Sequence, residues 1–197
     1  MIKFKDILDE VKLVPRRSKE ERRANYISAI NKNIQQYIKD GSKGELDLNG
    51  ISIERLPDNL KKVGGGLDLR GTKIITLPSD LKVDGDLDLA FTPIKELPFG
   101  LEVGDNLDLR RSNIKKLPDG LKVSGYLDLT DTFIKELPND LKVRGTLYLD
   151  HSWIYSLPSD LKVGGRLYLR NTPVARNYTE EQLKKLLPDV EGKIYTW

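Results

Sequence analysis

The sequence predicts a mainly β solenoid, in which about seven similar coils stack into a rod that carries a parallel sheet. The first observation behind this prediction is a repeated phrase in which two leucines flank one outward residue. The phrase spans residues 46–48, 67–69, 87–89, 107–109, 127–129, 147–149 and 167–169. Its first interval is 21 residues and the other five are 20. A period of this length is typical of coils that bury their apolar side only against their neighbours.

Two further columns keep the same period. A Leu-Pro pair turns the chain back toward the next coil, because proline fixes the turn there. These pairs begin at Leu56, Leu77, Leu97, Leu117, Leu137 and Leu157. A hydroxyl residue also recurs two positions before an inward Ile or Val, and we expect it to form a buried polar ladder by accepting from amides. The hydroxyl column is Thr72, Thr92, Ser112, Thr132, Ser152 and Thr172.

Each coil is expected to contain two extended segments. In the clearest copy Leu87 and Leu89 point inward and Asp88 outward, while Leu81 and Val83 point inward on a second segment. Gly85 lies between the segments, where we expect a bend with unusual backbone angles. Glycine recurs at this position except at residue 105, and aspartate tolerates left-handed angles better than most residues.

The ends of the chain leave the period, so we expect a helical cap over residues 1–42, the solenoid over 43–176 and a second cap over 177–197. Apolar residues at helical spacing predict one helix before Pro15, and a capping box of Ser18 and Glu21 opens another that closes at Gly41. The apolar positions are Phe4, Ile7, Leu8 and Val11 in the first helix, and Tyr26, Ile30, Ile34, Tyr37 and Ile38 in the second.

At the C-terminus, Thr179 and Gln182 form another capping box that opens a short helix, which Pro188 ends. The tail over residues 190–197 alternates enough to be extended, and we expect it to add a last strand to the stack. Caps of this kind cover strand amides that would otherwise invite aggregation.

Composition argues against catalysis. The 197 residues contain no cysteine, and His151 is the only histidine, so a thiol nucleophile, a serine triad and a histidine metal cluster lack their parts. We therefore expect no enzyme activity and no cofactor. Lys and Arg total 33 against 30 for Asp and Glu, which is too even to indicate a polyanionic partner. Neither a signal peptide nor a membrane span is visible, so we expect a cytoplasmic protein.

The first candidate surface is the outward column Asp47, Asp68, Asp88, Asp108 and Asp128. Arg70, Arg110 and Arg170 follow on the same strands and offset some of the charge. The column is either an ordinary solvated strand face or an acidic stripe for a basic partner, with divalent cations a less favoured ligand.

The second candidate surface begins at Tyr148 and Tyr168, where tyrosine replaces the aspartate of the outward column. Tyr, Trp and Arg on a rigid surface dominate binding energy in protein interfaces. The alternative is that the tyrosines stack to finish the sheet and that Trp153 packs on Phe133. Taking both surfaces together, we expect a partner to contact Asp88, Asp108, Asp128, Tyr126, Tyr148, Tyr168, Arg166, Arg170, His151 and Trp153.

These repeats resemble the leucine-rich repeat family, and their length and Leu-Pro return resemble its short bacterial class, known from secreted effectors. Two departures, Ser or Thr in place of the usual asparagine and Val-x-Gly-x-Leu before the strand, suggest a flatter coil than a horseshoe. The C-terminal segments 172–174, 178–181 and 192–195 are similar to uncharacterised repeat proteins of tailed bacteriophages. The ubiquitin-ligase domain of the effector class has no counterpart here.

The resulting hypothesis is a non-enzymatic module that binds a protein partner. In its more specific form, the chain is a phage protein that acts on a host protein. One alternative is a structural component of a phage particle. Another is nucleic-acid binding through a basic N-terminal segment, which is less favoured because Glu20 and Glu21 interrupt it. That segment contains Arg16, Arg17, Lys19, Arg22 and Arg23.

Overall fold

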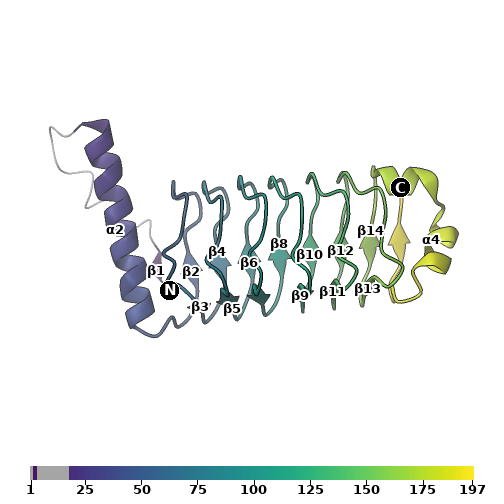
Figure 1. Ribbon diagram of the computed structural model, residues 1–197, viewed down its shortest axis with the longest axis horizontal. Helices are drawn as coiled ribbons and strands as arrows, with labels where there is room; N and C mark the ends of the chain where they lie inside the picture. The colour runs from purple at the N-terminus through teal and green to yellow at the C-terminus, as the bar shows by residue number, and fades with distance from the viewer. Residues whose placement is uncertain (1, 4–17) are drawn as a thin grey trace.

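The computed structural model describes residues 2–3 and 18–197, which form a rod of stacked coils (Figure 1). A nine-stranded parallel sheet runs along one side of the rod, in the order β1-β2-β4-β6-β8-β10-β12-β14-β15. Its strands are β1 (Ile2–Lys3), β2 (Leu46–Asp47), β4 (Leu67–Asp68), β6 (Leu87–Asp88), β8 (Leu107–Asp108), β10 (Leu127–Asp128), β12 (Leu147–Tyr148), β14 (Leu167–Tyr168) and β15 (Ile194–Tyr195). The seven repeated phrases therefore supply seven consecutive strands, which confirms the predicted fold class.

A second parallel sheet of six strands follows the segment that precedes each repeated phrase. It consists of β3 (Lys62–Val63), β5 (Lys82–Val83), β7 (Glu102–Val103), β9 (Lys122–Val123), β11 (Lys142–Val143) and β13 (Lys162–Val163). The register is constant, because each residue of a strand pairs with its equivalent one repeat away, as Leu87 does with Leu67 and Leu107. Outward residues therefore line up in straight columns along the rod.

The core lies between the two sheets and the return arms. Leu87, Leu89 and Ile94 are fully buried, as are their equivalents in the other coils, while Val83 closes the core from the second sheet. Alternation along each short strand places one residue in this core and the next on the outer side of the sheet. The predicted inward set is confirmed.

The first glycine of the column, Gly44, has the left-handed backbone that the sequence suggested, with φ of 76°, whereas later members serve close approach between coils. Gly85, Gly145 and Gly165 do not have positive φ angles. A Cβ atom at Gly145 would lie 2.6 Å from the carbonyl carbon of Gly125, and one at Gly165 would lie 2.7 Å from that of Gly145. The expectation of special backbone angles was wrong there, because backbone contact with the preceding coil is what excludes a side chain.

Left-handed backbone also occurs at the turn after the seven strands of the first sheet that the repeated phrases supply, from β2 to β14. Phe91, Arg111 and His151 have φ between 52° and 60° at this turn, and Gly50, Gly71, Asp131 and Asn171 occupy it in other coils. Glycine, asparagine and aspartate adopt this conformation readily, whereas larger residues are strained. These turns line up along the rod at the end of the strands, and we call this row of turns the ridge.

The hydroxyl column is buried, as expected, but its hydrogen bonds run differently. Thr72, Thr132 and Thr172 each donate to the carbonyl of the leucine three residues earlier, at 2.6–2.7 Å. Only Ser112 in this column accepts from the amide two residues on, at 3.4 Å, while Thr172 also accepts from an amide as the cap of a helix. The threonines thus fasten each turn to its own coil, because their hydroxyls reach the preceding carbonyl most easily.

Helix α2 (Lys19–Lys39) lies across the N-terminal end of the rod (Figure 1). Ser18 and Glu21 form the predicted capping box, and the helix buries Ile30, Ile34 and Tyr37 against the first coil. The Tyr37 hydroxyl donates to the carbonyl of Gly44 at 2.8 Å. The second predicted helix is confirmed, while the first, with Phe4, Ile7, Leu8 and Val11, lies outside the described residues.

At the other end, helices α3 (Pro173–Asn177) and α4 (Glu180–Leu186) precede the last strand. The predicted capping box of Thr179 and Gln182 opens α4, and Leu183 and Leu187 are buried. Strand β15 then pairs with β14, so the expected final strand is confirmed. Helix α3 was not predicted, because Thr172 caps it at the point where the repeat was still in phase.

Candidate partner-binding surface

The outward residues of the nine-stranded sheet form a surface that we call the strand face. Its N-terminal part carries the carboxylate column, Asp47, Asp68, Asp88, Asp108 and Asp128. In each of these strands the aspartate accepts the amide two residues on, for example that of Ala90 at 2.9 Å from Asp88. The repeated aspartate therefore has a structural task, because it satisfies an amide at the end of its own strand.

Arginines of the strand face neutralise part of this column. Arg70 reaches Asp68 at 2.6 Å and Asp88 at 3.5 Å, so it links two adjacent coils. Arg110 links Asp108, whose Oδ2 accepts its Nε at 2.9 Å, with Asp128 at 3.5 Å. These pairs lower the repulsion that stacked carboxylates would otherwise feel.

Two members of the predicted acidic stripe are covered. Asp108 is 4% exposed and Asp128 is 9% exposed, because they sit beneath the strand face arginine that they share. Burial raises the pKa of Asp128, and the charge of Asp108 raises it further. Burial likewise raises the pKa of Asp88. The expectation of a continuous exposed stripe was therefore wrong at Asp108 and Asp128, which support the surface from below.

The C-terminal part of the strand face carries a stack of three tyrosines. The ring centroids of Tyr148 and Tyr168 are 4.9 Å apart, and those of Tyr168 and Tyr195 are 4.6 Å apart. Their planes differ by only 11° and 5°. Tyr126 meets Tyr148 edge-on with centroids 6.1 Å apart. We call Tyr148, Tyr168 and Tyr195 the tyrosine stack, and all three are partly exposed.

Tyr195 was absent from the predicted site. Its strand repeats a basic residue, an aliphatic residue and a tyrosine, Lys193-Ile194-Tyr195, just as Arg166-Leu167-Tyr168 does one coil earlier. That match could have placed Tyr195 beside Tyr168 from the sequence, since the register pairs the two residues directly.

Cations surround the tyrosine stack. The guanidinium of Arg170 lies 5.0 Å from the centre of the Tyr168 ring, and the Lys193 ammonium lies 4.9 Å from that of Tyr195. A hydrogen bond with Tyr168 raises the pKa of Arg166. Arg170 is also paired with Asp150 at 3.3 Å. The predicted residues Tyr126, Tyr148, Tyr168, Arg166 and Arg170 are thus brought together on one surface.

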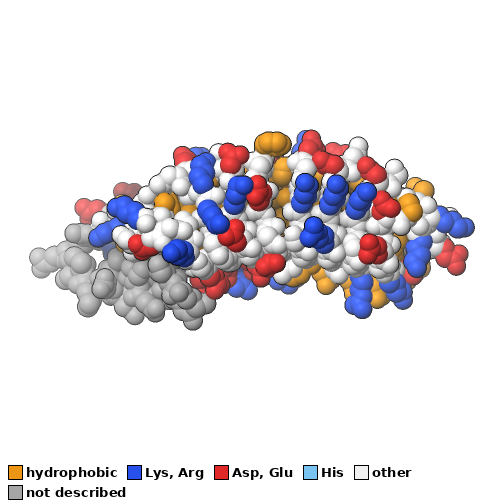
Figure 2. All heavy atoms as spheres, turned by 90° about the horizontal axis from the view of Figure 1, so that it is seen from below, with side chains coloured by type: hydrophobic (Ala, Val, Ile, Leu, Met, Phe, Trp, Pro, Cys, Tyr) orange, Lys and Arg blue, Asp and Glu red, His pale blue; other side chains and the backbone are white. Residues whose placement is uncertain are grey.

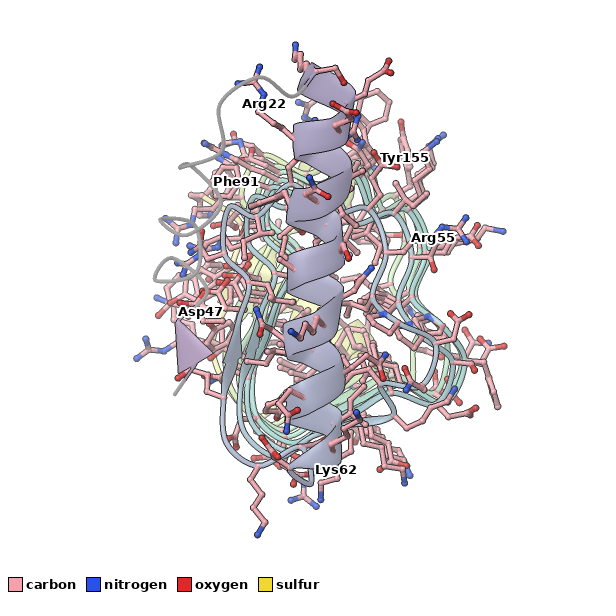
Figure 3. All side chains as sticks on the ribbon, turned by 90° about the vertical axis from the view of Figure 1, so that its left-hand side faces the viewer. Arg22, Asp47, Arg55, Lys62, Phe91 and Tyr155 are labelled. Carbon is pink, nitrogen blue, oxygen red and sulfur yellow. The ribbon has the colours of Figure 1, made fainter. Side chains whose placement is uncertain are left out.

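His151 and Trp153 lie at the ridge and beyond it. Figure 3, which views the rod from its N-terminal end, shows Asp47 on the strand face, Phe91 at the ridge and Tyr155 across the top of the coil. His151 occupies the same turn position as Phe91, and its ring lies 3.4 Å from the Asn171 amide. Trp153 packs on Phe133 with centroids 6.1 Å apart. The tryptophan therefore belongs to a separate aromatic pair outside the tyrosine stack.

The second sheet presents a row of lysines on another side of the rod, at the bottom of the coil in Figure 3, and Figure 2 shows basic side chains in a row on that side. Lys62 pairs with Asp84 and Lys82 with Glu102, both at 2.8 Å. These exposed pairs contribute little to stability. They show that this row is partly balanced by carboxylates of neighbouring coils.

Within residues 2–3 and 18–197 no three His, Cys, Asp or Glu side chains converge in a way that could hold a metal ion. The carboxylates of the strand face are instead bound to amides and arginines. Over the same part of the chain, no helix has both the length and the apolar character needed to cross a bilayer.

The repeat length, the parallel sheet along one side and the capped ends together define a leucine-rich-repeat solenoid. Among solved structures, the chain is similar to the leucine-rich-repeat domain of a Shigella effector, with a TM-score of 0.51 and 20% sequence identity. The match covers 99% of this chain and 98% of that chain. No protein-family model matches the chain. No curated protein matches it either.

Proposed function

We propose that the chain is a non-enzymatic protein-interaction module that binds a protein partner through the C-terminal part of the strand face. The observation that carries this proposal is the tyrosine stack with its surrounding cations. Tyrosine and arginine are the residues that most often dominate binding energy, and a stacked, partly exposed set loses little side-chain entropy on binding. The similarity to an effector leucine-rich-repeat domain supports an interaction role for the fold.

Within this proposal the predicted contact residues take different parts. The contact surface consists of Tyr148, Tyr168 and Arg166, and Tyr126 and Arg170 lie at its border. Asp88 contributes negative charge to the coils on the N-terminal side of this surface. Asp108 and Asp128 hold Arg110 in place. His151 lies at the ridge and Trp153 beyond it, where only a large partner contacts them.

The similarity of the C-terminal segments to phage repeat proteins extends the proposal to a phage protein that acts on a host protein in the bacterial cytoplasm. A bacterial lysate is therefore the source of partners to test first. The alternative of a structural part of a phage particle has less support, because α2 and β15 with α4 cover the ends through which rods would join.

Nucleic-acid binding through the basic N-terminal segment also has less support. Arg23 is paired with Glu54 at 2.8 Å, and Arg22 stands beside Glu20 and Glu21 at the start of α2. Arg16 and Arg17 lie outside the described residues.

The test is affinity capture from a bacterial lysate with the full chain as bait, followed by mass spectrometry. The double variant Tyr148→Ala with Tyr168→Ala is expected to lose the partner. The matched control is Tyr155→Ala with Tyr178→Ala, which removes two exposed tyrosines outside the strand face and is expected to retain it. Circular dichroism checks that both variants are folded. Retention of the partner by the first variant would contradict the proposal.

A further inference from the structure

The strand face contains two kinds of basic side chain, which differ in their partners. Arg70, Arg110 and Arg170 each contact a carboxylate of the same face. Arg166 and Lys193 make no such ion pair within the described residues. The Lys193 ammonium lies 4.9 Å from the centre of the Tyr195 ring, and interaction with Tyr168 raises the pKa of Arg166. Both side chains are exposed. Over residues 2–3 and 18–197, the positive charge of Arg166 and Lys193 is therefore not neutralised by an ion pair.

These two cations are also neighbours. The register of β14 and β15 pairs Leu167 with Ile194, so Arg166 and Lys193 occupy equivalent positions one strand apart. Adjacent strands are about 4.8 Å apart, which lets both side chains reach one extended segment lying along the rod.

The opposite end of the strand face has the opposite charge. An acidic groove over its N-terminal and middle coils is lined by Glu45, Asp68, Asp86, Asp88, Asp105 and Asp108, and it reaches Tyr126 at the border of the tyrosine stack. Among the residues that the structure describes, Asp68 and Asp88 are paired with Arg70 and Asp108 with Arg110, while Glu45, Asp86 and Asp105 have no arginine partner. A partner segment that carries negative charge is repelled from this end and attracted to the tyrosine stack, which is how a charged surface fixes the position of its partner.

We propose that the partner presents an acidic segment, rich in Asp or Glu, to the tyrosine stack, where Arg166 and Lys193 bind its carboxylates. This inference rests on the proposed function and adds the chemistry of the partner. The tyrosine rings supply the apolar contact beneath the ion pairs, and the guanidinium of Arg166 can bind a carboxylate through two hydrogen bonds. The groove at the other end of the strand face excludes the same segment.

The inference is tested with a fluorescently labelled oligoglutamate peptide and the full chain, by fluorescence anisotropy at low salt. The double variant Arg166→Glu with Lys193→Glu is expected to weaken binding by at least about tenfold. The matched control, Lys122→Glu with Lys142→Glu on the second sheet, changes the net charge of the chain by the same amount. It is expected to change the affinity by less than about twofold, since these lysines lie on another side of the rod.

Three results would overturn the inference. The first is no binding of oligoglutamate, and the second is equal weakening of its binding in the two double variants. The third is that an oligolysine peptide binds the wild-type chain more tightly than oligoglutamate does and that the Arg166→Glu, Lys193→Glu variant does not bind it. Its failure can be separated from failure of the proposed function by lysate capture. Full retention of the partner by the Arg166→Glu, Lys193→Glu variant overturns only the acidic segment. Retention by the Tyr148→Ala, Tyr168→Ala variant overturns the surface itself.

Discussion

Asp128 shows how one side chain on the strand face serves the fold. Its carboxylate accepts the amide of Thr130 at 2.9 Å and is nearly buried next to Asp108. An outward position in a short strand was expected to leave the group in water, yet Arg110 and the neighbouring coil cover it. The aspartates of this column are thus partly a repeated structural device, since each closes the end of its own strand.

The raised pKa of Asp128 gives a prediction about pH. Because burial raises the pKa above the ordinary value of 3.8, the charged carboxylate costs stability at neutral pH, and this cost disappears as the pH falls through the raised pKa toward 3.8. Asp128→Asn keeps the acceptor for Thr130 without the charge. We expect a higher Tm than wild type at pH 7 and no difference below pH 3.8, measured by thermal unfolding.

Asp119→Asn is the control, because Asp119 is exposed and lies on a return arm. It is expected to leave Tm unchanged at neutral pH. A lower Tm of Asp128→Asn at pH 7 would show that pairing with Arg110 outweighs the cost of burial, contrary to the expectation.

The glycine column explains how closely successive coils approach. Gly145 donates to the carbonyl of Gly125 at 2.9 Å, and the same bond joins Gly165 to Gly145. Asp105 occupies the column in one coil, and its amide is 3.2 Å from the carbonyl of Gly85. Side chains at this position therefore coincide with a slightly longer contact between coils.

Gly145→Ala is expected to lower the free energy of unfolding by about 1–3 kcal/mol, because its Cβ would lie 2.6 Å from backbone atoms of Gly125. Urea unfolding measures the change. Gly66→Ala is the matched control, since its Cβ would have no neighbour nearer than 3.5 Å and other coils carry side chains there. We expect that variant to stay within about 0.5 kcal/mol of wild type. Equal losses in the two variants would refute the close-approach explanation.

The elements differ in how far the sequence could predict them. The strands of the repeats, α2 and α4 follow from alternation and capping boxes, which are local signals. Strand β1 was not predicted, because residues 1–42 were expected to form a helical cap, yet Ile2–Lys3 pairs with β2. The role of the glycines could not be read locally, because it depends on the backbone of the preceding coil. The left-handed turn was visible in principle, since Gly50, Gly71, Asp131 and Asn171 share its column, but Phe91, Arg111 and His151 hide that pattern.

The candidate surface, too, could be predicted from the sequence only in part. Its columns were predicted because period and alternation fix which residues face outward. The stacking of Tyr148 on Tyr168 was foreseen as an alternative, and it turns out to coexist with partial exposure. The burial of Asp108 and Asp128 was not foreseen, because it depends on how Arg110 lies across two coils.

Across the whole molecule, stability depends on contacts between neighbouring coils, so the two ends matter more than in a compact domain. At the C-terminal end β15 pairs with β14, and Val190 bridges to Val163 of the second sheet. This tail therefore covers the last coil at both sheets.

A chain that ends at Pro188 would lose β15 and expose the amides of β14 together with one face of Tyr168. We expect this truncated chain to self-associate as its concentration rises, because an open strand edge is a template for another chain. Size-exclusion chromatography with light scattering measures the effect. Removal of Trp197 alone, which is 87% exposed, is the control and should leave the elution unchanged. A truncated chain that stays monomeric at all concentrations would contradict the importance of the tail.

The constant register of the sheet has a consequence for the ancestry of this chain. Because each junction between coils uses the same pairing, a gene segment that encodes one twenty-residue repeat can be duplicated or lost without disturbing the junctions on either side. Unequal recombination upstream of β12 can therefore change the length of the rod in whole coils, while the tyrosine stack on β12, β14 and β15 stays at the C-terminal end. Homologues of different length are expected to vary in the middle and to keep their endings.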